Sequence, residues 1–258
     1  MCIKNNSIDD ALYEKYGVKR SLRDLNGIGI NAGITNVSLS KSFTTDENGN
    51  RIPCAGELYY RGYEIHDLIK GFFLDNRFGF EECTYLLLFG VLPDEKELQN
   101  FKQVLNISYD LPHHFIQDVI MKSPTADIIA NMTKSTLALG SYDKKMGDNS
   151  LENVLQQCIQ LISMFPRLAV YSYQGYRHYE LGKSCYIHKP LPELSFAENI
   201  LSTLRSNRKY TRLEARVLDL ALVLHMEHGG GSNSTFTTRV VTSSGSDTYA
   251  TCLLYTSP

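Results

Sequence analysis

Apolar residues recur at three- and four-residue intervals along most of the chain after Arg61, and this spacing predicts amphipathic helices. The predicted helices cover Glu64–Lys70, Phe80–Phe89, an acidic segment opened by Pro93, Phe115–Met121, Ala126–Leu139, Leu151–Tyr173, Phe196–Leu204 and Arg212–His228. Pro166 lies inside the longest of them and is expected to kink or divide it. The breaks between helices do not have the composition of a flexible linker, so we expect one mainly α domain.

The pattern changes between Gly27 and Tyr60, where β-branched residues, glycines and turn formers replace the helical spacing. Asn48-Gly49 is a dipeptide typical of tight hairpin turns. The sequence therefore predicts a small β-hairpin, or a few short strands, ahead of the helices. A short helix is also expected at Ser7–Tyr16, with Ser7 as its N-cap.

The last predicted helix, Arg212–His228, has the clearest pattern. Its apolar residues share one face and are Leu213, Val217, Leu220 and Leu224. His228 follows Leu224 by four residues and is expected to be the last residue on that face, which we predict to be buried. Gly229–Gly231 come next, and glycines after a helix permit a left-handed cap and close approach of a ligand.

Several interpretations of His228 remain open on the residues alone. A histidine that ends an apolar face is commonly a structural residue with satisfied hydrogen bonds. His225 and His228 could bind a metal, but the spacing is not H-E-x-x-H, and we predict no metal site. His228-Gly229-Gly230-Gly231 also spells the oxyanion loop of some hydrolases, which belongs between a strand and a helix and requires a G-x-S-x-G segment. This sequence has no such segment.

Composition narrows the function classes. The 258 residues carry a formal net charge of -2, which gives no electrostatic footprint for nucleic acid or an acidic membrane. We expect no membrane span, because no apolar run approaches the required length. The six cysteines form no C-x-x-C pair, and the first residues do not read as a secretory signal. We therefore expect free thiols and a cytoplasmic location.

A resemblance to a known protein family indicates which reaction the chain could take part in. Residues 218–231, which read LDLALVLHMEHGGG, and residues 234–241, STFTTRVV, closely resemble the first catalytic segment of citrate synthases. Residues 57–63 resemble the R-G-Y/I segment of that family, residues 80–93 its F-E-E…L-L-L-F-G-x-L-P segment, and residues 164–169 its x-P-x-x-A helix. The resemblance extends in order from Ser7 to Ala250.

The resemblance implies a mainly α fold, the large domain of a citrate synthase. It implies an acyltransferase of the tricarboxylic acid cycle that condenses acetyl-CoA with oxaloacetate and then releases CoA. Acetyl-CoA is a substrate, and no cofactor or metal is implied. His228 is the expected catalytic residue, donating a hydrogen bond to the thioester oxygen as an enolate forms. Arg239 is a candidate for substrate binding, and the intact protein is expected to be a homodimer.

The sequence also departs from the family pattern. The later G-P-x-H-G-G-A-N segment, the catalytic aspartate and the oxaloacetate-binding arginines are absent. Many relatives have a substrate-binding histidine where this chain has Phe196, and many read Asp-His-Glu where it reads Glu227-His228-Gly229. A 2-methylcitrate synthase, which takes propionyl-CoA, and a non-catalytic helical fragment are the alternatives.

These departures lead to expectations about domain organisation. Residues 1–250 are expected to be the N-terminal part of the large domain, without the small domain and the C-terminal part, and to be inactive alone. Residues 251–258 are expected to be a non-native tail, because CLLYTSP resembles the translation of a transposase-end sequencing adapter.

Overall fold

A computed structural model describes residues 9–17, 34–47, 50–107, 110–228 and 233–252. The chain divides into residues 1–35 and 36–258, and each part is described by itself. In the first part, α2 (Asp10–Lys15) begins where the Asp9 carboxylate accepts a hydrogen bond of 3.0 Å from the Ala11 amide. A helix is therefore confirmed here, but its N-cap is Asp9, so the prediction of Ser7 as the N-cap is wrong.

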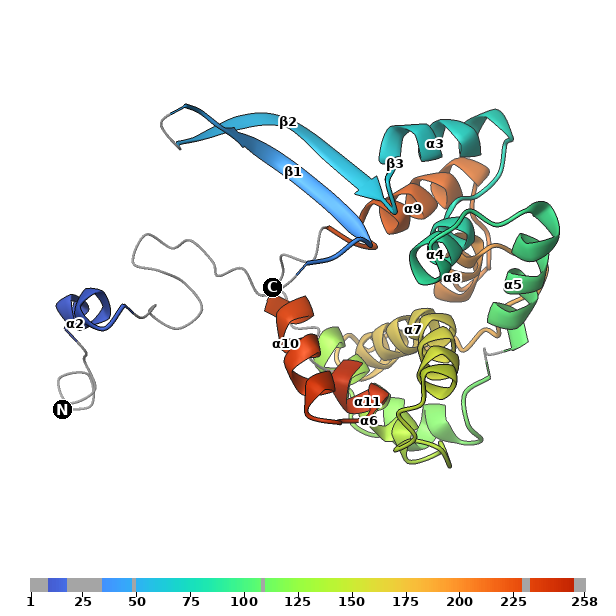
Figure 1. Cartoon of the computed structure of the whole chain (residues 1–258). Coiled ribbons are helices and arrows are strands. Elements are labelled where there is room, and N and C mark those ends of the chain that lie inside the picture. Colours follow the sequence, from blue (N-terminus) through green and yellow to red (C-terminus); the bar gives the residue numbers. More distant parts are fainter. Residues whose placement is uncertain (1–8, 18–33, 48–49, 108–109, 229–232, 253–258) are drawn as a thin grey trace. The chain divides into compact units, whose positions relative to one another are not determined.

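The second part begins with the predicted hairpin (Figure 1). Strand β1 (Ser38–Thr45) pairs antiparallel with β2 (Arg51–Tyr60), and β2 pairs with the short β3 (Tyr63–Glu64). The backbone and carboxylate of Asp46 both bind Asn50 and close the loop between the long strands. The strands confirm the hairpin, although Asn48-Gly49 themselves lie outside the described residues.

Helices make up most of the remaining chain, which confirms the mainly α prediction (Figure 1). They are α3 (Ile65–Leu74), α4 (Phe80–Phe89), α5 (Glu95–Ile107), the π-helix η1 (Ile116–Ile120), α6 (Ile128–Gly140), α7 (Leu151–Tyr179), α8 (Phe196–Leu204), α9 (Arg212–Leu224), α10 (Asn233–Ser243) and α11 (Thr248–Cys252). Helices α4 and α8 have the predicted bounds.

Helix α7 continues through Pro166, so the chain is not divided there, while a kink at Pro166 stays a prediction. A proline removes only one backbone hydrogen bond of a helix, and packing of the flanking turns can compensate. Leu161, Met164 and Leu168, on either side of Pro166, are buried in one apolar cluster. Tertiary packing thus holds together a helix that local sequence rules would interrupt.

Two apolar clusters form the core. The first joins the end of β2 to α3, α4, α8 and α9 and contains Tyr60, Ile65, Leu68, Phe72, Phe80, Cys83, Leu86, Phe196 and Val223. The second joins η1, α6, α7 and α11 and contains Phe115, Ile120, Leu139, Leu161, Met164, Leu168, Val170, Tyr171 and Tyr249. Ile200 of α8 packs against both clusters and links them.

A buried carboxylate connects α9 to the start of α4. Asp219 is 3% exposed and accepts hydrogen bonds from the amides of Gly79 (2.8 Å) and Phe80 (3.1 Å). A Cβ atom at Gly79 would lie 2.2 Å from the Phe72 ring, so only glycine lets the chain pass here. The carboxylate satisfies amides that the first turn of a helix leaves unpaired.

A second buried carboxylate connects α4 to the start of α8 in the same way. Glu81 Oε1 accepts a hydrogen bond of 2.8 Å from the Phe196 amide. Beside this contact the rings of Phe80 and Phe196 stack, with their centroids 4.1 Å apart. Helices α9, α4 and α8 are thus joined in series by carboxylates at helix N-termini.

The described cysteines and the residues near the C-terminus relate to two sequence predictions, the free thiols and the non-native tail. Cys54, Cys83, Cys158, Cys185 and Cys252 carry free thiols, as expected. Thr251 and Cys252 complete α11, and Cys252 packs against the second cluster, while residues 253–258 lie outside the described residues. A non-native tail from residue 251 stays a prediction.

Among the described residues, no helix combines the length and the apolar character that crossing a membrane requires.

Asp219 should make stability depend on pH. Burial raises its pKa to about 6 from the usual 3.8, so the folded chain holds this proton more tightly than the unfolded chain does. Between these pH values the free energy of unfolding should fall as pH rises, by up to about 3 kcal/mol. Asp219→Asn should remove this slope, as measured by urea denaturation at pH 4, 5, 6 and 7.

The exposed Asp67 of α3 provides the control. Asp67→Asn should keep the wild-type slope. An unchanged slope in Asp219→Asn would contradict the assignment.

Candidate functional site

Helix α9 ends at Leu224, so the prediction that it reaches His228 is wrong. The backbone amide of His225 bonds to the carbonyls of Ala221 and Leu222, which tightens the last turn. His225 Nδ1 also lies 2.7 Å from the Ala221 carbonyl oxygen. Side chain and backbone of His225 therefore use the carbonyls at the end of the helix, and His228 lies beyond it.

The buried face of α9 also differs from the prediction. Leu213, Val217 and Leu224 are 71%, 58% and 44% exposed. The buried residues are instead Ala215, Asp219 and Val223. The apolar spacing correctly predicted one face, but Asp219 directs the opposite side toward α4. Most of the apolar face stays exposed, and Leu220 on the same face is partly buried.

His228 is exposed and lies on the segment that follows α9. Its backbone amide donates a hydrogen bond of 2.9 Å to Glu227 Oε1. No hydrogen bond joins its imidazole to another described residue, so the ring is available to a ligand there. Gly229–Gly231, with the predicted left-handed cap, lie outside the described residues. The catalytic role of His228 stays a prediction.

Tyr60, the last residue of strand β2, contacts the C-terminal end of α9. Its hydroxyl donates a hydrogen bond of 2.7 Å to the Val223 carbonyl and lies 3.3 Å from the Glu227 carbonyl. Burial raises the pKa of Tyr60 to about 12, which keeps the phenol protonated as a donor. Tyr60 thus spans the turn between α9 and His228, and we regard it as a positioning residue.

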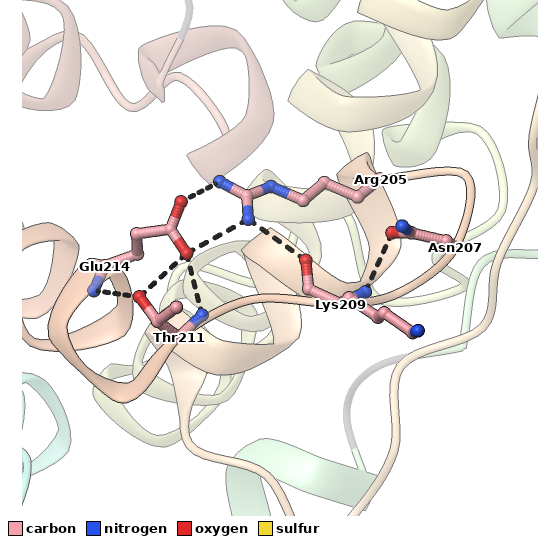
Figure 2. Close-up of polar contacts among 5 residues, drawn as sticks. All are labelled: Arg205, Asn207, Lys209, Thr211 and Glu214. Atoms are coloured by element: carbon pink, nitrogen blue, oxygen red, sulfur yellow. Dashed lines mark hydrogen bonds and ion pairs between the residues drawn. The ribbon is translucent and has the colours of Figure 1, made fainter.

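The other end of α9 is fixed by an ion pair and a capping box (Figure 2). Thr211 and Glu214 bind each other's backbone amides, and the Arg205 guanidinium binds both oxygens of Glu214 at 2.6 and 3.1 Å. Hydrogen bonding to Arg205 lowers the pKa of Glu214 to about 2, so this carboxylate is ionised at neutral pH. These contacts set where α9 begins.

The remaining predicted site residues lie elsewhere. Arg239 is exposed on α10, and its role in substrate binding stays a prediction. Phe196 is buried against Phe80 and belongs to the first cluster. Among the described residues there is no group of His, Cys, Asp or Glu side chains that could hold a metal ion.

Tyr60 and Asp219 position the site, and neither role was predicted from the sequence. Tyr60 was part of a recognised segment, but nothing local to it indicates a partner at Val223. Asp219 interrupts an apolar helix, which is the one signal that could have shown it to be buried. Together they fix the end of α9 and the residues just before an exposed imidazole that can donate a hydrogen bond.

Comparisons with known proteins agree with the sequence resemblance. The family model described as "Citrate synthase, C-terminal domain" matches residues 31–253. The citrate synthase of Heyndrickxia coagulans is 31% identical over 193 residues, covering 75% of this chain and 48% of that protein. The citrate/2-methylcitrate synthase of Bacillus subtilis (strain 168) is 29% identical over 195 residues, covering 76% and 49%.

Solved structures show the same relationship. Citrate synthase from Pyrobaculum aerophilum superimposes with a TM-score of 0.69 at 25% identity, covering 88% of this chain and 52% of that one. The Thermoplasma acidophilum enzyme, in a ternary complex with carboxymethyl coenzyme A and oxaloacetate, has a TM-score of 0.68 at 26% identity, covering 87% and 52%. The chain therefore spans about half the length of the proteins it matches.

Tyr60→Phe should loosen the segment that carries His228. Removing the hydroxyl leaves the buried Val223 carbonyl without this donor, which should lower the free energy of unfolding by about 1–3 kcal/mol. The neighbouring Tyr59, whose hydroxyl meets Glu57 at 3.3 Å in a partly exposed position, is the matched control. Tyr59→Phe should cost below about 0.5 kcal/mol in the same urea titration. Equal effects of the two changes would contradict the anchoring role of Tyr60.

Proposed function

The chain belongs to the citrate synthase family, and on that basis we propose that the whole protein condenses acetyl-CoA with oxaloacetate and releases citrate and CoA. The observation that carries the proposal is the family match over residues 31–253, which includes the His228 segment. In this reaction acetyl-CoA is a substrate, and the proposal requires no cofactor or metal.

The exposed imidazole of His228 suits the proposed role. Deprotonation of the acetyl methyl group moves negative charge onto the thioester oxygen, and a hydrogen-bond donor fixed beside that oxygen stabilises the charge. Anchoring by Tyr60 would reduce the cost of orienting this donor at the moment of reaction. The base and the carboxylate-binding arginines implied by the family resemblance have no counterpart among the residues matched here, and the whole protein must supply them.

Propionyl-CoA is the second candidate acyl substrate. The Bacillus subtilis relative carries both names, citrate and 2-methylcitrate synthase. One methylene in an apolar pocket changes binding by only about 1–3 kcal/mol, so both activities can occur in similar sites. We therefore propose acetyl-CoA as the preferred substrate and propionyl-CoA as a slower one.

We further propose that the protein is a homodimer that uses the exposed face of α9. This face carries Leu213, Val217 and Leu224, and contiguous exposed apolar residues of this kind support a protein interface. A second copy is the proposed occupant, because α9 is then buried on both sides as an apolar helix requires. We place the protein in the cytoplasm, which the free thiols support.

His228→Ala in the whole protein should lower kcat by roughly 100-fold or more, as loss of a single oxyanion donor does. His225→Ala is the matched control and should have a much smaller effect, because His225 contacts only the end of α9. The measurement is thiol release from acetyl-CoA and from propionyl-CoA with oxaloacetate. Small and equal decreases in kcat for the two variants would indicate that His228 is structural. If the wild-type protein released no thiol with either thioester, the proposed activity would be wrong.

The double change Leu213→Lys and Val217→Lys should weaken self-association of the chain. Both side chains are more than half exposed, so the change should disturb the interface and not the fold. Sedimentation velocity should show dimers or larger species for the wild type and mainly monomers for the variant. Leu151→Lys, on an exposed residue of α7, is the control and should behave as wild type. A wild-type chain that stays monomeric at micromolar concentration would contradict the interface.

A further inference from the structure

Two arginines of α9 meet at one residue of the turn between α3 and α4. Arg212 Nη2 donates a hydrogen bond of 2.8 Å to the Asn76 carbonyl, and Arg216 Nη2 donates to Asn76 Oδ1. Asn76 has a φ of 53°, a left-handed conformation that asparagine tolerates better than most residues. Arg212 and Arg216 are four residues apart and therefore lie on one side of α9. The two guanidinium groups are thus brought together at a single point of the turn.

Both guanidinium groups are held at the surface. Asn76 and Arg212 are exposed, and Arg216 is half-buried. Aromatic rings cover the flat faces of the two groups. The guanidinium carbon of Arg216 lies 5.2 Å from the centroid of the Phe73 ring, and that of Arg212 lies 5.8 Å from the centroid of Phe78. Because a guanidinium donates hydrogen bonds in its own plane, stacking of this kind orients the group and leaves its donating edge accessible.

No carboxylate of the described residues forms an ion pair with Arg212 or Arg216. The carboxylates of Asp75, on the same turn, and Glu82, on α4, are paired with Arg77 instead. Two like charges four residues apart on a helix repel each other. An anion that accepts hydrogen bonds from both arginines would remove this repulsion.

The contacts with Asn76 do not require charged donors, because both of its oxygens are neutral and an amide could donate to them equally well. The acidic residues of α9 do not require these two arginines either. Glu214 is paired with Arg205, and Asp219 accepts hydrogen bonds from two backbone amides. The positive charges at the turn are therefore not explained by the contacts within the described part of the chain.

We propose that Arg212 and Arg216 form a binding site for a small oxyanion with two negative charges, such as phosphate or a short dicarboxylate. Each guanidinium donates to an oxygen of the anion, while Asn76 and the stacked rings keep the two groups in place. Charge-assisted hydrogen bonds from two cations favour a dianion over a monoanion. The site shares no residue with the His228 segment, so it does not depend on the proposed condensation.

The probes are inorganic phosphate and malonate, with acetate as the singly charged comparison, at constant ionic strength and a mildly alkaline pH at which phosphate is a dianion. NMR signals of the arginine Nε–H groups report directly on the two guanidinium groups. We expect saturable shifts of Arg212 and Arg216 with phosphate or malonate, and at least about threefold weaker binding of acetate. Titration at two protein concentrations separates this binding from self-association, because only self-association changes with protein concentration.

Arg212→Gln and Arg216→Gln each remove one charge and should weaken binding of the dianion by at least about threefold, followed through the remaining arginine and the amides of residues 73–78. Arg216→Lys keeps the charge and should bind the dianion more tightly than Arg216→Gln. A purely structural role of Arg216 predicts no such rescue, and Arg216→Lys also tests the site if a glutamine variant fails to fold.

Arg51→Gln is the matched control. Arg51 is also exposed and stacked, 4.3 Å from the centroid of the Phe43 ring, but its described contacts include no second arginine. This change should alter affinity for the dianion by less than about 1.5-fold. Three results would each overturn the proposal: no saturable shift of Arg212 and Arg216 in the wild type, affinity unchanged in both glutamine variants, or an equal loss in Arg51→Gln.

Discussion

The pairing of the Asp219 carboxylate with the amides of Gly79 and Phe80 is the contact on which the helical arrangement depends. A carboxylate at this depth is costly unless its oxygens are bonded, and the first turn of α4 supplies the free amides. The pairing fixes which side of α9 faces inward. Glu81 repeats the arrangement one helix further, at the start of α8. Between the two contacts the stacked rings of Phe80 and Phe196 exclude water and strengthen both.

This orientation of α9 determines where the candidate catalytic histidine lies. With Asp219 directed at α4, Val223 enters the first apolar cluster and its carbonyl meets the Tyr60 hydroxyl. The hydroxyl and His225 then engage the carbonyls at the helix end, so the chain leaves the helix before His228. An imidazole beyond a helix end can meet a ligand from more directions than one packed on a buried face. The proposed enolate chemistry needs that access as well as the anchoring.

The same orientation leaves the apolar face of α9 exposed, and this connects the fold to the proposed assembly. In α9 the buried carboxylate needs hydrogen-bond donors on one side, and the apolar residues on the other side are stabilised by packing against another surface. The inner side is satisfied within the chain. The outer side remains exposed, which supports the proposed self-association.

The sequence by itself determined the family, the hairpin, the bounds of α4 and α8, and the place of His228 within its segment, because ordered motifs, turn residues and helix caps act over short distances. Tertiary structure alone decided the buried face of α9 and the continuity of α7 through Pro166, while the end of α9 also depends on the local contacts of His225. The period of Leu213, Val217 and Leu224 marks an apolar face without saying what covers it. Asp219 faces the interior because amides far away in the sequence need an acceptor, and Tyr60 ends the helix because packing brings its hydroxyl to Val223. Such pairings exist only once the chain has folded, so no local pattern encodes them.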